Sequence, residues 1–197
     1  MLRNYTPLPA NALLTDIGYA QPTQAVPDRV TLDSPAIEVM TDLKRVTAII
    51  ILSGDTVDEA HRRMIQRSVR LLLVVDQDRR ILGVITANDV LGEKPVQTAV
   101  ERGIRREEVL VRDVMTPRER LQVLDMEQVR SARVGHVVAT LRQAGRQHSL
   151  VVDRNEQGRQ RLRGIVSATQ VARQLGVTIQ TSAVANTFSE IESLLAR

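Results

Sequence analysis

Short aliphatic runs separated by charged turns are the main feature of the hydrophobic pattern. Residues 71–75 and 149–152 both end in Val-Val, and each is followed by aspartate, a polar turn and a second run, over 81–85 and 162–166. Short apolar runs bounded by turn residues are typical of buried strands, so each region predicts two strands joined by a turn. Further strands are predicted over residues 46–52 and 121–124.

Apolar residues spaced three or four positions apart predict the helices. Residues 56–66 place four apolar side chains on one face, with Asp55 as the expected N-cap. Ser34 and Pro35 predict the start of a helical turn, because serine caps helices and proline is favoured at the first helical position. Other helices are predicted at residues 87–91, 95–101, 134–141, 168–175 and 182–196. The last has an apolar stripe that is expected to pack against the module or a second subunit.

The element order occurs twice, and sequence motifs recur with it. Gly-Val-Ile-Thr-Ala-Asn-Asp at residues 83–89 has a counterpart, Gly-Ile-Val-Ser-Ala-Thr-Gln, at residues 164–170, and Val-Met-Thr precedes both, at 39–41 and 114–116. The predicted fold class is therefore α/β, with two pseudo-symmetric β-α-β-β-α units in one module. The expected organisation is an N-terminal arm (1–38), a first unit (39–92), a connecting helical segment (93–112), a second unit (113–176) and a C-terminal amphipathic helix (177–197).

Composition narrows the protein class. Hydrophobic residues make up 43% of the chain and aromatic residues 2%, so the core must be aliphatic and a base-stacking platform for nucleic acid is disfavoured. The basic residues are almost all arginine and are scattered, which is typical of a solvated surface. There is no cysteine and no histidine spacing typical of a metal site, and no apolar run reaches the length of a membrane span. We therefore expect a cytoplasmic protein without a metal centre.

Thr86 and Asp89 are the first candidates for chemistry. A hydroxyl residue followed three positions later by an acid is a capping box, in which each side chain satisfies a backbone N–H at the start of a helix. The alternative is ligand binding, because a carboxylate accepts two hydrogen bonds from the vicinal hydroxyls of a ribose, and a helix N-terminus attracts phosphate. The second copy has Ser167 and Gln170, which are expected to preserve the capping box but to form a weaker ribose acceptor.

With these repeated motifs, residues 39–176 resemble a tandem pair of cystathionine β-synthase (CBS) domains, often called a Bateman module. The resemblance implies a regulatory module that binds adenosine-containing ligands such as AMP, ATP or S-adenosylmethionine in clefts between the units. The family often has a proline before Val-Val-Asp, where this chain has Leu73 and Leu150. The residues implied for nucleotide binding are Thr41, Arg70, Val84, Ile85, Thr86 and Asp89, with a second, weaker site formed by Thr116, Ile165, Val166, Ser167 and Gln170. His148 is interpreted as a surface histidine.

The sequence contains no catalytic motif. It has neither a glycine-rich phosphate loop with lysine nor a nucleophile elbow, so we expect no enzyme activity and no catalytic cofactor. The leading hypothesis is a stand-alone sensor that binds AMP, ADP, ATP or S-adenosylmethionine, with or without Mg²⁺, forms a homodimer and signals to an effector protein. The alternatives are a ligand-free dimerisation module and, with less support, a nucleic-acid-binding protein.

Overall fold

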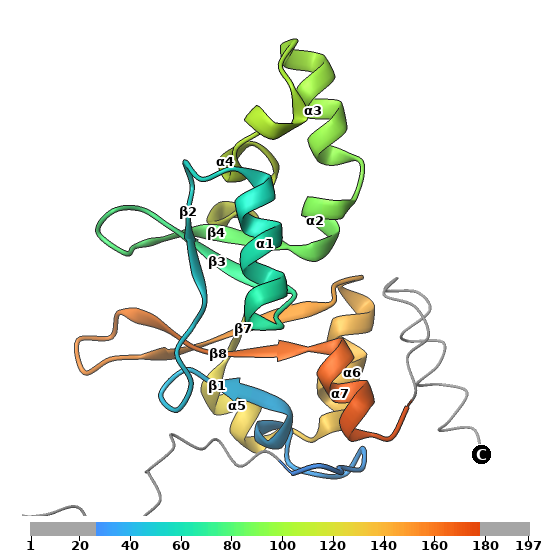
Figure 1. Cartoon of the computed structure of the whole chain (residues 1–197). Coiled ribbons are helices and arrows are strands. Elements are labelled where there is room, and N and C mark those ends of the chain that lie inside the picture. The colour runs from blue at the N-terminus through green and yellow to red at the C-terminus, as the bar shows by residue number, and fades with distance from the viewer. Residues whose placement is uncertain (1–26, 178–197) are drawn as a thin grey trace, which may run out of the picture.

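Two four-stranded sheets, each covered by helices, form the described part of the chain (Figure 1). The computed structural model describes residues 27–177 of the 197-residue chain. Most of the expected N-terminal arm and the tail helix expected over residues 182–196 therefore lie outside the described residues. Among residues 27–177, no helix combines the length and apolar character needed to cross a bilayer.

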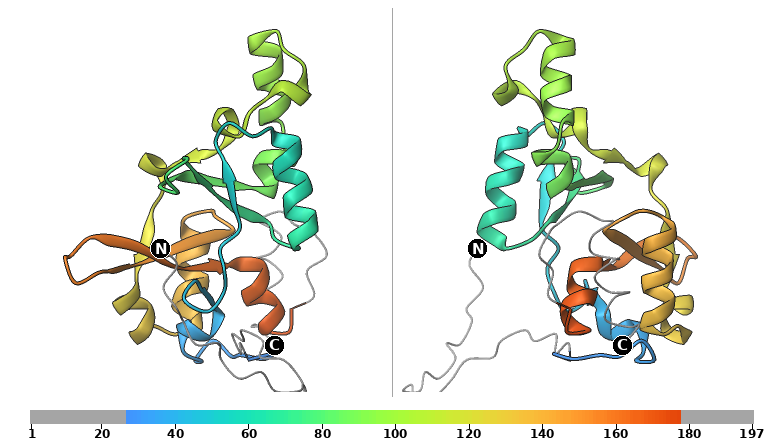
Figure 2. Two further views of the ribbon diagram at one scale, coloured as in Figure 1. Left: turned by 60° about the vertical axis from the view of Figure 1, so that its left-hand side comes forward. Right: turned by 90° about the vertical axis from the view of Figure 1, so that its right-hand side faces the viewer.

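The first sheet has the order β2-β3-β4-β5, with β2 parallel to β3 and the other neighbours antiparallel. Helices α1 and α2 lie beside this sheet, and α3 lies at the end of the molecule farthest from the second sheet (Figure 2). The elements are β2 (Ile50–Leu52), α1 (Val57–Arg67), β3 (Leu71–Val75), β4 (Ile81–Thr86), α2 (Ala87–Leu91), α3 (Lys94–Arg102), η2 (Arg106–Glu108), α4 (Val111–Val114) and β5 (Thr116–Pro117).

The second sheet has the order β1-β8-β7-β6 and repeats this plan. Strand β6 is parallel to β7, and the β7–β8 hairpin is antiparallel. The elements are η1 (Ala36–Val39), β1 (Met40–Asp42), η3 (Arg118–Arg120), β6 (Val123–Asp125), α5 (Met126–Ser131), α6 (Val134–Gln143), β7 (His148–Arg154), β8 (Gln160–Ser167) and α7 (Ala168–Gln174).

The two units exchange their first strands. Strand β1 pairs with β8 of the second unit, where Thr41 lies opposite Ile165, and β5 pairs with β4 of the first unit, where Thr116 lies opposite Val84. Each sheet therefore contains a strand from outside its own unit. The unit boundaries 39–92 and 113–176 stay a prediction from the sequence repeat. In the structure, each sheet includes one strand from the sequence range of the other unit.

The repeated glycine of the central motif is required by this exchange. A Cβ at Gly83 would lie 2.3 Å from the backbone carbonyl oxygen of Thr116, and one at Gly164 would lie 2.4 Å from Sδ of the buried Met40. Both contacts are closer than non-bonded atoms allow. A glycine at each position therefore lets the exchanged strand approach the hairpin.

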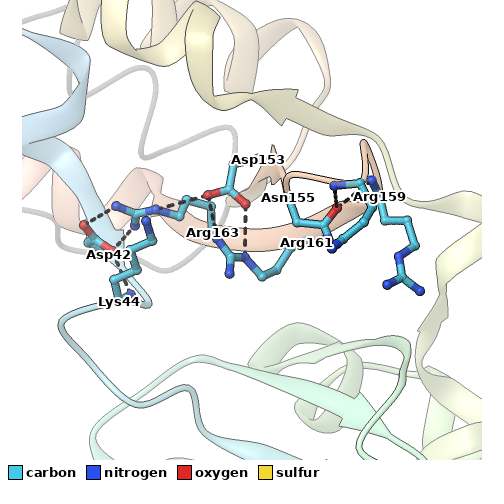
Figure 3. Close-up of polar contacts among 8 residues, drawn as sticks. Asp42, Lys44, Asp153, Asn155, Arg159, Arg161 and Arg163 are labelled. Atoms are coloured by element: carbon cyan, nitrogen blue, oxygen red, sulfur yellow. Dashed lines mark hydrogen bonds and ion pairs between the residues drawn. The ribbon is translucent and has the colours of Figure 1, made fainter.

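A buried ion pair joins β1 to β8 (Figure 3). The Arg163 guanidinium binds the Asp42 carboxylate through both terminal nitrogens, with the second contact at 2.8 Å, and both residues are buried. Asp153 lies on the other side, with its Oδ2 3.5 Å from Arg163 Nε, and it also pairs with Arg161. Separating β1 from β8 would leave buried charges without partners, which is costly. The ion pairs therefore stabilise the exchanged position of β1.

The core has three aliphatic clusters. One lies within each half, and the third lies between the sheets, where Leu71, Leu73 and Val84 of the first half pack with Leu150 of the second. Helix α1 shows how the sequence pattern forms the core, because Val57, Ala60 and Met64 are buried on its inner face. The two halves thus share apolar surface that neither buries alone.

Several local predictions are corrected. Thr56, not Asp55, caps α1, because Thr56 Oγ1 accepts a hydrogen bond from the Glu59 backbone N–H at 3.2 Å. Asp55 instead accepts one from the Leu52 N–H at 3.2 Å. The strand predicted over 46–52 is limited to β2, since residues 43–49 form a turn and an irregular connection.

The helical turn predicted at Ser34 is also different. It is the short 3₁₀ turn η1, which begins at Ala36 without a side-chain cap. Ser34 Oγ accepts a hydrogen bond from the Thr31 N–H at 3.0 Å, so it stabilises the preceding turn instead. Helix α5, capped by Asp125 through the Glu127 N–H, was not predicted, because its six residues are too few to show a clear helical period.

Candidate functional site

Two clefts lie between the halves of the molecule. One is lined by Asp89 and has a volume of about 400 Å³, and the other is lined by Gln170 and has a volume of about 520 Å³. We call them the Asp89 cleft and the Gln170 cleft. Both volumes lie in the range of small-molecule sites. Leu71 and His148, the first residues of β3 and β7, line both clefts, so the two cavities meet at the centre of the pseudo-symmetric pair.

The Asp89 cleft is built mainly from β4, α2 and segments of the second unit. Val84 and Thr86 from β4 face it, and Thr116 from the exchanged strand β5 lies across from Val84 in the sheet. Basic side chains surround these groups. They are Lys94 from α3, Arg120 from η3 and Arg146 from the turn before β7.

Asp89 is held in place by the capping box that the sequence predicted. Its Oδ2 accepts hydrogen bonds from the Thr86 backbone N–H at 3.0 Å and from Thr86 Oγ1 at 2.6 Å. Its Oδ1 forms a close ion pair with Lys94 Nζ, which also lies 3.5 Å from the Val114 carbonyl oxygen. The carboxylate is largely buried, while Lys94 is half-exposed. A ligand hydroxyl at Oδ1 must therefore share the carboxylate with Lys94 or displace it.

The second copy of the motif lacks the predicted capping box. Ser167 makes no side-chain capping hydrogen bond, and Gln170 Oε1 instead lies 3.4 Å from Thr41 Oγ1 of β1. The prediction that Gln170 completes the cap with Ser167 was wrong. The reason is tertiary: the exchanged strand places a hydroxyl donor beside the Gln170 amide, which leaves its local position.

The strand exchange also regroups the predicted site residues. Thr41 was grouped with Asp89 and Thr116 with Gln170, but Thr41 lines the Gln170 cleft and Thr116 lines the Asp89 cleft. Arg70, expected in the Asp89 site, likewise lines the Gln170 cleft. These residues keep the side-chain chemistry expected of them, but each faces a different ligand-sized space.

Strand alternation separates another predicted set. Val84 and Ile165 face the clefts, whereas Ile85 and Val166, one residue further along their strands, are fully buried in the cores of their own halves. The grouping of Ile85 and Val166 with the cleft is corrected, because successive side chains of a strand point to opposite faces.

His148 lies at the junction of the clefts and is half-buried, which corrects its interpretation as a surface residue. Burial and the nearby positive charge of Arg70 lower its pKa to about 4, and the negative charge of Asp89 opposes this only in part. At neutral pH the imidazole is therefore uncharged. It offers one hydrogen-bond donor and one acceptor, not a cation.

Other cleft residues were missed by the sequence reasoning. Lys94, Arg120 and Arg146 reach the Asp89 cleft from three separate elements, and nothing in their spacing links them to Asp89. Arg67 and Arg173 line the Gln170 cleft. Arg67 lies three residues before Arg70, so two arginines in the turn between a predicted helix and strand were a usable signal.

Residues 36–95 match the family model described as the CBS domain. The chain has the fold of a tandem CBS pair, and the matched segment covers its first unit. This confirms the resemblance and the α/β fold class that the repeat predicted. No curated protein is similar enough by sequence to count as a match.

Solved structures of two CBS pairs and of one uncharacterised protein share this fold. An uncharacterised conserved protein from Pyrococcus horikoshii is 19% identical, with 78% of this chain and 100% of that chain covered and a TM-score of 0.53. CBSX2 from Arabidopsis thaliana, in complex with AMP, is 22% identical, with coverage of 71% and 94% and a TM-score of 0.50. The CBS pair of MJ0100, in complex with 5′-methylthioadenosine and S-adenosylmethionine, is 17% identical, with coverage of 73% and 96% and a TM-score of 0.50.

Proposed function

We propose that this CBS pair is a non-enzymatic regulatory module that binds an adenosine-containing ligand in the Asp89 cleft. The observation that carries the proposal is the Asp89 carboxylate, held at the wall of a ligand-sized cleft and surrounded by cationic side chains. The bound AMP, 5′-methylthioadenosine and S-adenosylmethionine of the two similar CBS pairs support the ligand class.

Each polar group has a role in this proposal. Asp89 Oδ1 accepts a hydrogen bond from a ribose hydroxyl, while Oδ2 stays bonded to Thr86, and the apolar wall formed by Val84 and Leu71 contacts the base. Lys94, released from Asp89, then becomes available to a ligand phosphate together with Arg120 and Arg146. Ligands with phosphate should therefore bind more tightly than adenosine, because they replace the ion pair that the ribose breaks.

The proposal includes an output through other chains. We infer that the module acts in the cytoplasm as a homodimer and transmits ligand occupancy to an effector protein. Exposed aliphatic side chains on the neighbouring helices α2 and α3 support a subunit contact, because exposed apolar patches mark interaction surfaces. They are Leu91, Val96 and Val100.

A specific observation also favours the alternative of a ligand-free dimerisation module. Asp89 already binds Thr86 and Lys94. In a ligand-free module its role would be structural, namely to cap α2 and to hold α3 through Lys94. The two functions differ in one measurable property, which is affinity for adenosine derivatives.

Isothermal titration calorimetry of the full chain with adenosine, AMP, ADP, ATP and S-adenosylmethionine, with and without Mg²⁺, tests the proposal. We expect one adenosine-dependent site per chain. Asp89→Asn keeps the size of the side chain but removes its charge, so it should weaken that binding by about 1 to 3 kcal/mol.

Asp113→Asn is the matched control. Asp113 also caps a short helix, through the Leu110 N–H, and also pairs with an arginine, Arg102, but it does not line the Asp89 cleft or the Gln170 cleft. Its substitution should leave ligand affinity unchanged. Absence of binding by the unmodified protein, or full affinity of Asp89→Asn, would favour the ligand-free module.

A further inference from the structure

The Gln170 cleft gathers three arginines, Arg67, Arg70 and Arg173, and no carboxylate lines it. Within residues 27–177, none of these guanidinium groups has an ion-pair partner. The Asp89 cleft differs, because an acid lines it and Lys94 pairs with that acid, Asp89. Three like charges in one concave space repel one another and create a positive potential that attracts anions.

Arg70 is the least solvated of the three. It is half-buried, and its Nε is buried without a hydrogen-bond partner. A buried donor without a partner is costly, so this nitrogen is poised to donate to an acceptor in the cleft. Burial is the main cause of the lowered pKa of His148, and the positive charge of Arg70 on the shared wall of the two clefts lowers that pKa further.

The turn between α1 and β3 places Arg67 and Arg70 at the Gln170 cleft. Helix α1 ends at Arg67, and Ser68 adopts the left-handed conformation (φ 52°) before β3 begins at Leu71. Ser68 also lines the cleft. Ser68 is the C-cap residue of α1, and its N–H donates to the Ile65 and Met64 carbonyl oxygens, so the end of the helix fixes this turn. Arg173 reaches the same space from α7, so the cationic groups surround the cleft from both halves.

The polar group that would recognise a ribose is missing from this cleft. Gln170 replaces the acid of the first motif, and its carbonyl oxygen already accepts a hydrogen bond from Thr41. A neutral nucleoside would therefore gain little from Gln170 and would leave the arginines uncompensated. A ligand with several negative charges close together would satisfy them, because guanidinium groups bind phosphate oxygens through paired hydrogen bonds.

We propose that the Gln170 cleft is an oligophosphate site, which binds a chain of two or more linked phosphates, either free or as the tail of a nucleotide. Arg70 and Arg67 contact the chain from the turn after α1, and Arg173 contacts it from α7. The inference goes beyond the proposed function and does not depend on nucleoside binding in the Asp89 cleft.

Calorimetry with tripolyphosphate, which has neither base nor ribose, tests this site in the full chain. We expect one tripolyphosphate per chain, bound more weakly as salt is raised, because salt screens the attraction. Orthophosphate should bind much more weakly, since it reaches fewer arginines. Arg67→Ala/Arg173→Ala should reduce tripolyphosphate affinity about tenfold or more, as expected for the loss of charge-assisted hydrogen bonds.

Arg112→Ala/Arg130→Ala is the control, because both arginines are exposed and lie outside the Gln170 cleft, and the change in net charge is the same. It should retain affinity within about twofold if the site is specific, since screened surface charges contribute little. No binding of tripolyphosphate, or an equal loss in the two double variants, would overturn the proposal.

Binding to the Asp89→Asn protein distinguishes a free oligophosphate from the tail of a nucleotide. The same titrations test this inference and the proposed function separately. In that background, equal affinity for ATP and tripolyphosphate identifies a free oligophosphate, and tighter binding of ATP identifies a nucleotide tail. If adenosine derivatives never bind but tripolyphosphate does, the proposed function fails and this inference stands. If AMP binds in a manner that requires Asp89 while tripolyphosphate does not bind, the reverse holds.

Discussion

His148 occupies the position in the second half that Leu71 occupies in the first half, so the two halves differ in side-chain chemistry at this position. The first residue of β3 is Leu71 and the first residue of β7 is His148, and both lie where the clefts meet. Their strand partners are the equivalent hydroxyl residues Thr86 and Ser167. An imidazole thus replaces an aliphatic side chain near the symmetry axis, between Arg70 on one side and Asp89 on the other.

This histidine should make stability depend on pH. Its pKa is lowered from 6.5 to about 4 in the folded protein, so between these values the unfolded chain takes up a proton that the folded chain does not. Its contribution is fully present above pH 6.5 and is lost as pH falls toward 4. The loss should be at most about 3 kcal/mol, from the equivalence of one pKa unit and about 1.4 kcal/mol.

Urea denaturation at pH 7 and pH 4.5 measures this loss. His148→Leu, which copies Leu71, and His148→Gln, which keeps a polar side chain, both remove the titrating group. Carboxylates also titrate over this range, so the informative quantity is the difference between the unmodified protein and each variant. An identical loss of stability in all three proteins would contradict the buried, neutral histidine.

At the scale of elements, the close approach of the exchanged strands decides which residues the clefts contain. Strand β5 carries Thr116 into the Asp89 cleft, and β1 carries Thr41 into the Gln170 cleft. The backbone contact at Gly83 is rigid, whereas the contact at Gly164 is with a flexible methionine side chain. The two repeated glycines should therefore differ in their tolerance of substitution.

We expect Gly83→Ala to reduce the free energy of unfolding by about 1 to 3 kcal/mol, the usual cost of overpacking. Gly164→Ala should cost less, because Met40 can change rotamer. Thermal or urea denaturation measures both, with Gly54→Ala as the control, since a Cβ there has no atom within 4 Å. Gly83→Ala should also weaken adenosine-ligand binding, because it moves Thr116. Equal stability of the Gly83 and Gly54 variants would show that β5 does not approach β4 so closely.

For the whole molecule, the proposed homodimer is the property most open to a direct test. The described chain exposes Leu91 of α2 by 62% and Val100 of α3 by 77%. Helix α3 lies at the end of the molecule away from the second sheet (Figure 2). Light scattering should give about twice the 22.0 kDa mass of the chain at micromolar concentration. A monomer at that concentration would refute the dimer.

Two changes locate the contact. Leu91→Asp/Val100→Asp places charges on the exposed helix surface and should shift the dimer to monomer if α2 and α3 form the contact. A chain ending at residue 181 removes the predicted tail helix and should do so if its apolar stripe forms the contact. Exposed Arg112→Ala is the control and should leave the mass unchanged.

Local sequence was sufficient for the elements whose causes lie within a few residues. The hairpins, helix α1 with its buried face and the Thr86–Asp89 capping box all follow from hydrophobic spacing and local hydrogen bonding, and the repeat indicated a tandem CBS pair. Asp89 is held by Thr86, which is only three residues away, so the local sequence could predict its position.

The composition of the clefts depends on contacts between distant segments. Thr41 and Gln170 are 129 residues apart, and Asp42 and Arg163 are 121 apart, yet the exchanged strands bring each pair together. No local pattern shows that β1 pairs with β8 instead of its own unit, because an edge strand's backbone hydrogen bonds fit either sheet. Two contacts favour the exchanged pairing. They are the close packing of the strands on Gly83 and Gly164 and the Asp42–Arg163 ion pair, and both form only when the two halves pack together.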